Sequence, residues 1–308
     1  NQDSISKIDK MKLKKILLFG KDGQVGQALC EALANHYELV ALGRDELNLE
    51  KGKLINQMID DVNPDCLINA AAYTKVDQAE DEHTLATSIN KFATEIMAKK
   101  THILGIPMIY YSTDYVFDGS KSIAYKEDDI PNPISFYGAT KLQGEKAVRE
   151  NNPKHVILRT SWVFSPHGNN FVKTIIELAK NKSALTVVSD QLGSPTSSRW
   201  IARSTHKILN KLQEKDCYGT YHVVCDGVTN WFTFAQNILL MLEEKTYEKK
   251  LEFNQITPIK SDEYPTKAKR PKNSALSYQK LNSLLDISPP SWKNELNRVI
   301  DSIILMEN

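Results

Sequence analysis

The sequence predicts an α/β protein, with a doubly wound parallel sheet and a smaller α+β cap in its C-terminal half. Short apolar runs alternate with helical patterns up to about residue 186, which is typical of a parallel sheet covered by helices on both faces. A glycine-rich turn lies between the first apolar run and the first helical pattern, as in sheets that bind nucleotides. Beyond residue 186, turns and more widely spaced helices replace the alternation, which indicates a second part of the structure.

Each expected strand is a short apolar run, and each expected helix places apolar residues at the spacing of one face. The expected strands are 15–19, 38–42, 66–69, 107–112 and 155–159. The helices are expected from 25 onward, at 54–62, at 86–100, from 135 onward and at 170–178. In open parallel sheets, ligands bind at the carboxyl ends of the strands. Residues that follow these strands are therefore the first candidates for a functional site.

The second half is expected to cover the carboxyl ends of the sheet. Its helices are predicted at 199–212, 231–243 and 292–304, with extended segments at 219–224 and 251–259 and an irregular stretch at 264–278. Residues 1–10 are polar and lack the apolar region of a signal peptide, so a disordered leader is expected there.

Composition excludes several classes of function. The formal net charge is +1 at pH 7, so no broad basic surface indicates nucleic-acid binding. No stretch approaches the roughly 18 apolar residues of a membrane span. The four cysteines, at 30, 66, 217 and 225, have no C-x-x-C spacing. Reduced thiols in a cytoplasmic protein are therefore expected.

The glycine-rich turn has the sequence Gly20-Lys21-Asp22-Gly23-Gln24-Val25-Gly26 and follows the first strand directly. Glycines let the backbone approach a pyrophosphate, and the N-terminus of the next helix attracts its negative charge. The turn, its glycines, Gln24 and Val25 are therefore predicted to bind a dinucleotide, with a tight turn that has no ligand as the alternative.

The end of the second strand bears on the choice of cofactor. The strand leads into Gly43-Arg44-Asp45, where dinucleotide-binding sheets often place an acid for the ribose 2′-hydroxyl or an Arg for a 2′-phosphate. Because a guanidinium suits phosphate geometry, Arg44 favours NADPH, with NADH also possible. The alternative is that Arg44 only faces solvent.

Tyr137 and Lys141 are the candidate catalytic pair. Positions i and i+4 share one face of a helix, and a nearby ammonium is expected to lower the pKa of the tyrosine. Such a tyrosine can exchange a proton with a carbonyl or hydroxyl group. Thr113, at the tip of the strand ending near Ser112, can supply a third hydrogen bond. Alone the pair could be an ordinary surface pair, but the glycine-rich turn favours a functional interpretation.

These segments together resemble one family, the dTDP-4-dehydrorhamnose reductases of the extended short-chain dehydrogenase/reductase superfamily, whose sheet is of the Rossmann type. The resemblance runs from Lys15 to about Trp292. The segments that carry it are 20–26, 69–77, 112–117, 137–141, 159–164, 168–171, 190–196 and 270–274.

The resemblance implies an NAD(P)H-dependent oxidoreductase. The C4 keto group of dTDP-4-dehydro-β-L-rhamnose would be reduced to give dTDP-β-L-rhamnose, in the last step of dTDP-L-rhamnose biosynthesis. The product is a donor for bacterial surface polysaccharide such as O-antigen. Tyr137 would protonate the forming alkoxide, and Lys141 would tune Tyr137 and hold the nicotinamide ribose. Thr113 would polarise the carbonyl or adjust Tyr137.

The same resemblance places further residues along the ligands. Those beside the cofactor would be Gly23, Gln24 and Val25 at the pyrophosphate, Asn48 and Leu49 at the adenine, and Ala72, Tyr73 and Thr74 farther along. Asp114 and Trp162 would contact the sugar nucleotide, and Arg270 would bind its diphosphate. The alternatives are that Trp162 is a core aromatic, that Arg270 is solvated, and that 70–74 packs tightly without a ligand.

We accordingly divide the chain into a dinucleotide-binding domain at 11–165 and a mainly substrate-binding domain at 166–308. Parts of 166–190 are expected to complete the sheet of the first domain.

One departure from the family concerns metals. Some members carry acidic residues for a divalent cation at a dimer interface, but the matching positions here are Ala28 and Arg199. A hard cation requires carboxylate oxygens, and the histidines have no ligand spacing, so no metal site is expected. The protein is expected to be a monomer or a homodimer.

Two other functions remain open at this stage. The chain could be another sugar-nucleotide epimerase or 4-keto-sugar reductase, since the fold and the catalytic pair would be the same. It could also be a non-catalytic binding protein, because a similar fold serves as a regulatory subunit of methionine adenosyltransferase.

Overall fold

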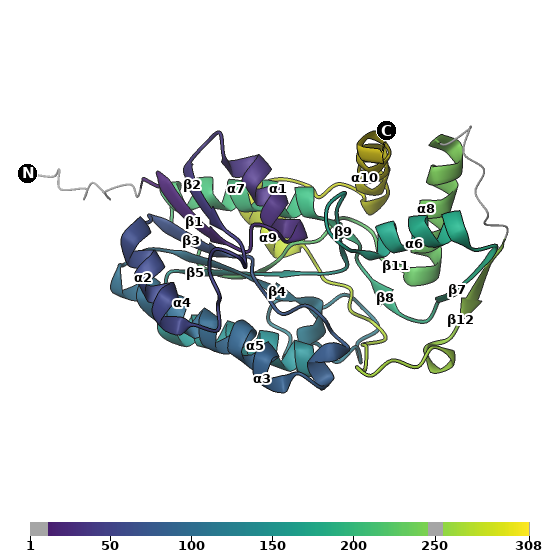
Figure 1. Cartoon of the computed structure of the whole chain (residues 1–308), viewed down its shortest axis with the longest axis horizontal. Coiled ribbons are helices and arrows are strands. Elements are labelled where there is room, and N and C mark those ends of the chain that lie inside the picture. The colour runs from purple at the N-terminus through teal and green to yellow at the C-terminus, as the bar shows by residue number, and fades with distance from the viewer. Residues whose placement is uncertain (1–11, 246–254, 308) are drawn as a thin grey trace, which may run out of the picture.

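The computed structural model describes residues 12–245 and 255–307. Its main sheet has six strands in the order β10-β5-β4-β3-β1-β2, and every pair is parallel (Figure 1). The strands are β1 (Lys15–Phe19), β2 (Glu38–Leu42), β3 (Cys66–Asn69), β4 (Met108–Thr113), β5 (His155–Thr160) and β10 (Gly219–His222). The order reverses at β1, because β2 lies on one side of it and β3 on the other. Ligands bind at such a switch point, outside the carboxyl ends of the strands.

Helices cover both faces of this sheet (Figure 1). One face carries α1 (Gln24–Leu33), α7 (Ser198–Glu214) and α9 (Gln279–Leu285), and the other carries α2 (Gly52–Val62), α4 (Thr94–Ile103) and α5 (Phe136–Asn151). Successive residues of β1 alternate between the two cores: Ile16 and Leu18 belong to the cluster under α1 and α7, whereas Leu17 and Phe19 belong to the cluster under α2 and α4. Because side chains alternate between two buried faces, nearly every position of such a strand is apolar and the strand is a continuous apolar run.

The second part of the fold gathers beyond one end of the main sheet (Figure 1). Its helices are α6 (Phe171–Asn181), α8 (Trp231–Lys245) and α10 (Trp292–Glu307). Its strands form three small pairs: β7 (Ala184–Val188) with β12 (Gln255–Ile259), β8 (Leu192–Gly193) with β11 (Thr229–Asn230), and β6 (Val163–Phe164) with β9 (Thr196–Ser197). No helix among the described residues is long and apolar enough to cross a membrane.

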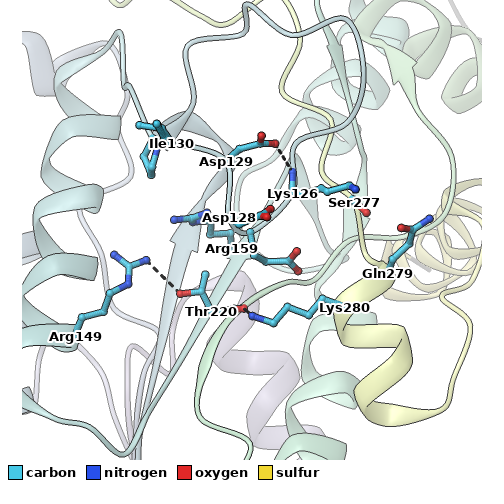
Figure 2. A pocket seen from close by; sticks show the side chains of 12 residues that line it. Lys126, Asp128, Asp129, Ile130, Arg149, Arg159, Thr220, Ser277, Gln279 and Lys280 are labelled. Carbon is cyan, nitrogen blue, oxygen red and sulfur yellow. Dashed lines mark hydrogen bonds between the residues drawn. The ribbon is translucent and has the colours of Figure 1, made fainter.

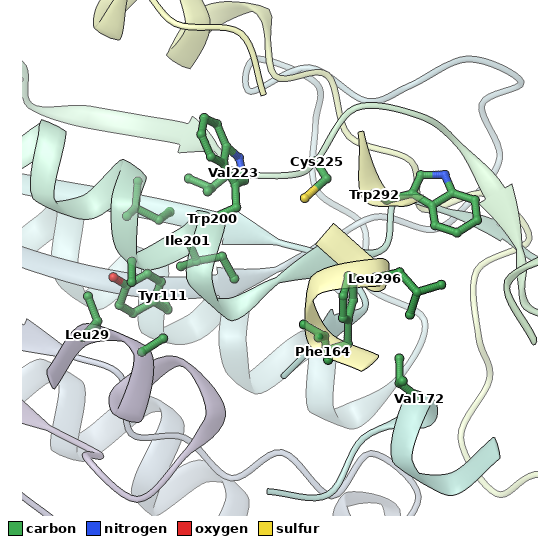
Figure 3. Close-up of a cluster of buried hydrophobic side chains, with 14 of the residues drawn as sticks. Leu29, Tyr111, Phe164, Val172, Trp200, Ile201, Val223, Cys225, Trp292 and Leu296 are labelled. Atoms are coloured by element: carbon green, nitrogen blue, oxygen red, sulfur yellow. The ribbon is translucent and has the colours of Figure 1, made fainter. Parts of the chain in front are cut away.

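One hydrophobic core joins the two parts. Figure 3 shows this cluster running from Leu29 of α1 and Tyr111 of β4, past Trp200 of α7, to Phe164 and Leu296 in the second part. Because these side chains pack as one group, the second part is held firmly at the end of the sheet.

The completion of the sheet differs from the sequence-based expectation. The sixth strand is β10, not a segment of 166–190, and residues 184–188 pair instead with β12. Helix α7 packs along α1 and returns the chain to the sheet, as the crossover between parallel strands requires. The run Gly219–His222 is too short and polar for its sequence to reveal this partner. The proposed boundary at 165/166 stays a prediction, and the segments predicted at 1–10 and 251–254 lie outside the described residues.

The helix expected at 86–100 is also divided. It consists of α3 (His83–Thr87), a π-helical turn η2 (Ser88–Ala93) and α4. Single π-turns inside helices occur frequently at functional sites. The short 3₁₀ turns are η1 (Gln78–Glu80), η3 (Asp114–Val116) and η4 (Ser261–Glu263).

Candidate active site

The glycine-rich turn is built for close backbone approach. Gly20 has φ +92°, and a Cβ there would lie within 2.5 Å of the Ala71 nitrogen; a Cβ at Gly26 would overlap the carbonyl of Gly20. At Gly23 a Cβ would meet only the Gly20 oxygen, at 3.5 Å, so the turn is open at this point. Gly23 is also the N-cap of α1 and supplies no side-chain cap. The first N–H groups of α1 can therefore receive an anion, and the turn fits a pyrophosphate.

Gln24 and Val25 form the first turn of α1. The Gln24 Oε1 accepts a hydrogen bond of 3.0 Å from Asn170 Nδ2, which ties the turn to the N-cap of α6. Val25 packs against the larger core. Ala28 is buried in the same core, and Arg199 pairs with Glu295 at 3.3 Å.

The tip of β2 carries Arg44, the residue predicted to bind a ribose 2′-phosphate. The Gly43 N–H donates to Glu46 Oε2 at 2.6 Å, and the same carboxylate pairs with Lys21. A side chain at Gly43 would overlap the carboxylate of Asp22. Arg44 follows on the exposed surface, where its guanidinium is accessible to a 2′-phosphate. Asn48 is exposed, and Leu49 packs on the core under α2.

The loop after β3 is fixed by a residue that the sequence analysis did not identify. Asn90, buried in the π-helical turn, accepts a hydrogen bond of 2.8 Å from the Tyr73 N–H and donates one of 3.1 Å to the Tyr73 carbonyl. Its amide also donates to Thr140 Oγ1 at 3.0 Å, one residue before Lys141. Asn90 therefore connects the predicted cofactor loop to helix α5. The only signal in the sequence is a polar residue inside an expected helix.

The other residues of this loop differ in exposure. Ala72 is partly buried and Thr74 is exposed. Tyr73 is buried, and its hydroxyl donates to Glu82 Oε2 at 2.6 Å. Tyr73 therefore offers its backbone, rather than its hydroxyl, to a ligand.

Helix α5 carries the candidate catalytic pair. Ser135 caps the helix by accepting a hydrogen bond of 3.1 Å from the Gly138 N–H, which places Tyr137 in the first turn. Lys141 is only 2% exposed. Its Nζ donates to the Tyr111 carbonyl at 2.6 Å and lies 4.2 Å from the centre of the Tyr110 ring. The pair thus faces the end of β4, as the i, i+4 spacing predicts.

Burial dominates the protonation of this pair. It raises the pKa of Tyr137 to about 12, although a hydrogen bond with Thr113 acts in the opposite direction. It lowers the pKa of Lys141 to about 7, against the charge of Glu145. The tyrosine pKa thus moves opposite to the direction expected from the sequence, because removing water disfavours phenolate and a lysine of this pKa is only partly charged near neutrality. Tyr137 is therefore a proton donor in the free protein.

Thr113 and Asp114 form a hydrogen-bonded group at the end of β4. The Thr113 hydroxyl donates to Asp114 Oδ1 at 3.0 Å and accepts from the Tyr115 N–H at 3.2 Å. Ser161 donates to Asp114 Oδ2 at 2.9 Å. Burial raises the pKa of Asp114 to about 6. Because a hydroxyl has one hydrogen and that of Thr113 is given to Asp114, Thr113 in this arrangement cannot also donate to a substrate carbonyl.

Trp162 lies in an aromatic stack. Its ring is parallel to that of Trp231, with centroids 3.5 Å apart and planes at 8°. Its backbone has φ +45°, which is rare for a non-glycine residue. A side chain at Gly193 would overlap the Trp162 ring. Trp162 is thus fixed by its neighbours but remains partly exposed.

Arg270 is engaged by a carboxylate of the other part of the fold. Its two terminal nitrogens donate to the two oxygens of Asp77, at 3.1 and 2.8 Å. This hydrogen bond lowers the pKa of Asp77 below its ordinary value. This ion pair connects the segment that contains Arg270 to the loop after β3. It also neutralises the guanidinium that was predicted to bind a diphosphate.

A cavity of about 730 Å³ lies elsewhere, between loop 126–131, the end of α5, β10 and the start of α9 (Figure 2). Arg149, which lines it, is twelve residues along α5 from Tyr137, or about 18 Å at 1.5 Å per residue. The two guanidinium groups of this cavity are already paired: Arg159 binds Glu145 through two bonds of 2.8 Å, and Arg149 binds Glu145 at 2.7 Å. The cavity is therefore separate from the catalytic pair, and both of its guanidinium groups are already bound to Glu145.

The described residues contain no group of three or more His, Cys, Asp and Glu side chains placed to hold a metal ion. The expectation of a metal-free protein stays a prediction.

Known proteins of one family are similar to this chain over most of its length. The family model described as "RmlD substrate binding domain" matches residues 14–304. The dTDP-4-dehydrorhamnose reductase of Salmonella typhimurium is 39% identical over 290 residues, which cover 92% of this chain and 96% of that protein. The Escherichia coli K12 protein of the same name is 38% identical over 293 residues, covering 94% and 97%.

Solved structures are also similar to this chain. A dTDP-4-dehydrorhamnose reductase from Bacillus anthracis, in complex with NADP, superposes with a TM-score of 0.84 at 35% identity, covering 96% of this chain and 100% of that one. A UDP-glucose 4-epimerase from Thermotoga maritima shares the fold at a TM-score of 0.76 with only 18% identity. Since the family model spans residues 14–304 and the relatives are 38–39% identical over more than nine tenths of the chain, the protein belongs to the dTDP-4-dehydrorhamnose reductase family.

Proposed function

We propose that this protein is an NADPH-dependent dTDP-4-dehydrorhamnose reductase. The observation that carries the proposal is the arrangement at the end of β4, where a protonated Tyr137 lies beside Thr113 and one helical turn from Lys141. This group lies at the carboxyl ends of the strands, where the open glycine-rich turn also lies. Family membership supplies the substrate, dTDP-4-dehydro-β-L-rhamnose, and the product, dTDP-β-L-rhamnose.

The cofactor would be held by backbone groups and a few side chains. The N–H groups at the start of α1 would receive the pyrophosphate, and Arg44 would receive a 2′-phosphate. Asn48 and Leu49 would lie at the adenine, and Ala72 to Thr74 farther along. When bound, NADPH supplies the hydride that reduces the C4 carbonyl.

Side chains of the protein would donate the proton that the reduction requires and stabilise the resulting phenolate. Tyr137 would donate its hydroxyl hydrogen to the C4 oxygen as negative charge develops there. Lys141, held by the Tyr111 carbonyl, would stabilise the phenolate that remains and donate to the nicotinamide ribose. Thr113 would hold the Tyr137 hydroxyl in place through the hydrogen bond between the two side chains.

The substrate side rests on three residues. Asp114 would accept hydrogen bonds from sugar hydroxyls, and the exposed part of Trp162 would lie against the sugar nucleotide. Arg270 would reach the diphosphate only by exchanging Asp77 for phosphate oxygens. We also propose that the enzyme acts in the cytoplasm, since all four cysteines are free, and that it is a monomer or a homodimer whose product serves surface polysaccharide.

The proposal is tested by following NADPH absorbance while dTDP-4-dehydro-L-rhamnose is generated in place. The expected result is oxidation of NADPH in a one-to-one ratio to dTDP-L-rhamnose formed. An epimerase would convert the sugar without net oxidation, and a binding protein would bind NADPH without turnover. Either of these results would reject the reductase function.

Arg44→Ala is expected to weaken NADPH binding by about 10- to 100-fold, because a charge-assisted hydrogen bond to the 2′-phosphate is lost. Binding of NADH, which lacks that phosphate, should change little. Titration calorimetry with both nucleotides measures the difference, and Arg203→Ala, an exposed arginine on α7, is the control. Equal losses for both nucleotides would show that Arg44 does not recognise the 2′-phosphate.

Asp114→Asn is expected to alter the pH dependence of kcat/KM. In the wild type, the Asp114 carboxylate gains a proton as the pH falls through its pKa of about 6. The protonated group accepts hydrogen bonds from sugar hydroxyls less well, so KM rises below that pH. The plot of kcat/KM against pH therefore falls on its acid side, which we call the acid limb. The Asn variant should have a KM about tenfold higher at pH 7.5 and lack this acid limb. Ser161→Ala should keep the limb but move it to higher pH, because its hydrogen bond lowers the Asp114 pKa. An unchanged limb in Asp114→Asn would contradict this role.

A further inference from the structure

One buried hydroxyl at the end of the sheet has no partner. Thr160 Oγ1 is among four buried side-chain polar atoms of the described residues without a hydrogen bond; the others are Ser112 Oγ, Ser204 Oγ and His222 Nδ1. Nearly all buried polar groups in proteins are paired, and each exception calls for an explanation. An unpaired hydroxyl of this kind costs free energy that a ligand can recover.

Thr160 lies beside the catalytic group. It is the last residue of β5, and its partner in the parallel register is Thr113 of β4. Neighbouring residues in register point to the same face of a sheet, so the two threonine side chains lie side by side. The next residue, Ser161, shares the Asp114 carboxylate with Thr113. The unpaired hydroxyl therefore belongs to a residue adjacent to the hydrogen-bonded group of Thr113, Asp114 and Ser161.

The face on which Thr160 lies is the one covered by α1. Alternate β5 residues Val156 and Leu158 belong to the core under α1 and α7, whereas Arg159 faces α5 and binds Glu145 there. Helix α1 is the helix that follows the glycine-rich turn. Thr160 is thus on the same face of the sheet as α1; 8% of its surface is exposed, although its Oγ1 atom is itself buried.

The donors and acceptors that remain unused among these hydroxyls indicate which chemical group of a ligand could bind here. The hydroxyl hydrogens of Thr113 and Ser161 are both given to Asp114, so Thr160 is the hydroxyl of this group that is free to donate as well as accept. A neutral amide, with one carbonyl oxygen and one NH₂ group, can accept a hydrogen bond from a neutral hydroxyl or donate one to it. The reactive ring of NADPH carries such an amide next to the carbon that exchanges hydride.

We propose that Thr160 Oγ1 binds the carboxamide of the nicotinamide ring and so fixes the orientation of that ring beside Tyr137. The inference rests on the proposed cofactor, but not on the identity of the sugar substrate. Losing this contact should weaken only those nucleotides that carry the nicotinamide. ADP-ribose 2′-phosphate contains the rest of NADP⁺ and lacks that ring, so it is a direct probe of the difference.

The test compares Thr160→Val with the wild type by titration calorimetry with NADP⁺ and with ADP-ribose 2′-phosphate. Valine keeps the shape and removes the hydroxyl. We expect NADP⁺ to bind about tenfold more weakly, as for one lost hydrogen bond, while ADP-ribose 2′-phosphate binds as before. The melting temperature of the ligand-free variant should not fall, because an unpaired buried hydroxyl is removed. Thr160→Ser, which restores the hydroxyl, should recover most of the NADP⁺ affinity.

Ser204→Ala is the matched control, since Ser204 Oγ is equally buried and unpaired but lies within α7; both nucleotides should bind it normally. Equal weakening of both nucleotides by Thr160→Val, or no weakening of either, would overturn the proposal. If Thr160→Val folds poorly, Thr160→Ala must show the same contrast. Failure of the reductase assay together with this contrast would reject the proposed substrate and leave the role of Thr160 standing.

Discussion

Tyr137→Phe is expected to lower kcat by about 10²–10⁴-fold, the usual loss when a general acid is removed. NADPH affinity should stay within about twofold, because the ring remains and the nucleotide is held mainly by the glycine-rich turn and Arg44. The physical reason is that burial raises the pKa of Tyr137 to about 12. The hydroxyl therefore carries its proton at every pH of interest, and phenylalanine has no proton to deliver.

The measurement is single-turnover oxidation of NADPH, with binding followed separately by calorimetry. Tyr115→Phe is the control, because the Tyr115 ring lies edge-on to Tyr137 with centroids 6.0 Å apart, yet it has no proposed part in the chemistry. A Tyr137→Phe variant with near wild-type turnover would show that Tyr137 is not the proton donor. A large loss of NADPH affinity would show that Tyr137 acts through binding.

Lys141→Met is expected to have the second largest effect, a loss of about 10²-fold or more in kcat together with weaker NADPH binding. Methionine keeps the length of the side chain and its apolar character, so the buried space stays filled. What disappears is the ammonium that stabilises the phenolate after proton transfer and donates to the ribose. Steady-state kinetics and calorimetry separate the two losses; a variant that loses affinity but keeps kcat would assign Lys141 to binding alone.

The stability of the same variant depends on pH in a defined direction. Burial lowers the pKa of Lys141 to about 7, below the roughly 10.4 of an unfolded lysine. Between these values the unfolded chain binds more protons, so this lysine costs stability that diminishes as the pH rises from 7 toward 10. Without ligand, Lys141→Met should therefore melt above the wild type at pH 7, and the difference should shrink by pH 10. A lower melting temperature at pH 7 would contradict a buried, destabilising ammonium.

The sequence identifies the parts of this site that depend on local rules. Tyr137 and Lys141 share a helix face because of their spacing, and Thr113 lies at a strand tip because the apolar run ends there. Gly20 and Gly26 have the close backbone contacts that a nucleotide-binding turn requires. Each of these features follows from periodicity or from glycine's small size. The roles assigned to these residues remain proposals.

The parts that escaped the sequence analysis depend on partners distant in the chain. Asn90 gains its role through Tyr73 and Thr140, and Ser161 through Asp114. The tyrosine pKa was placed on the wrong side of its ordinary value because burial, which outweighs the neighbouring lysine, is a tertiary property. The ion pair between Arg270 and Asp77 is likewise not visible in the sequence, and the role of Arg270 at a diphosphate stays a prediction. Strand β10 joins the main sheet only because α7 returns the chain along α1.

The most direct test of this function uses NADPH that carries deuterium at both C4 positions of the nicotinamide, with dTDP-4-dehydro-L-rhamnose generated in place. We expect dTDP-L-rhamnose with one deuterium, bound to C4 of the sugar, in water that contains no deuterium. NMR and mass spectrometry of the product measure its position and number. Unlabelled product, or deuterium at another carbon, would contradict the claim that this chain transfers hydride from NADPH to the C4 carbonyl.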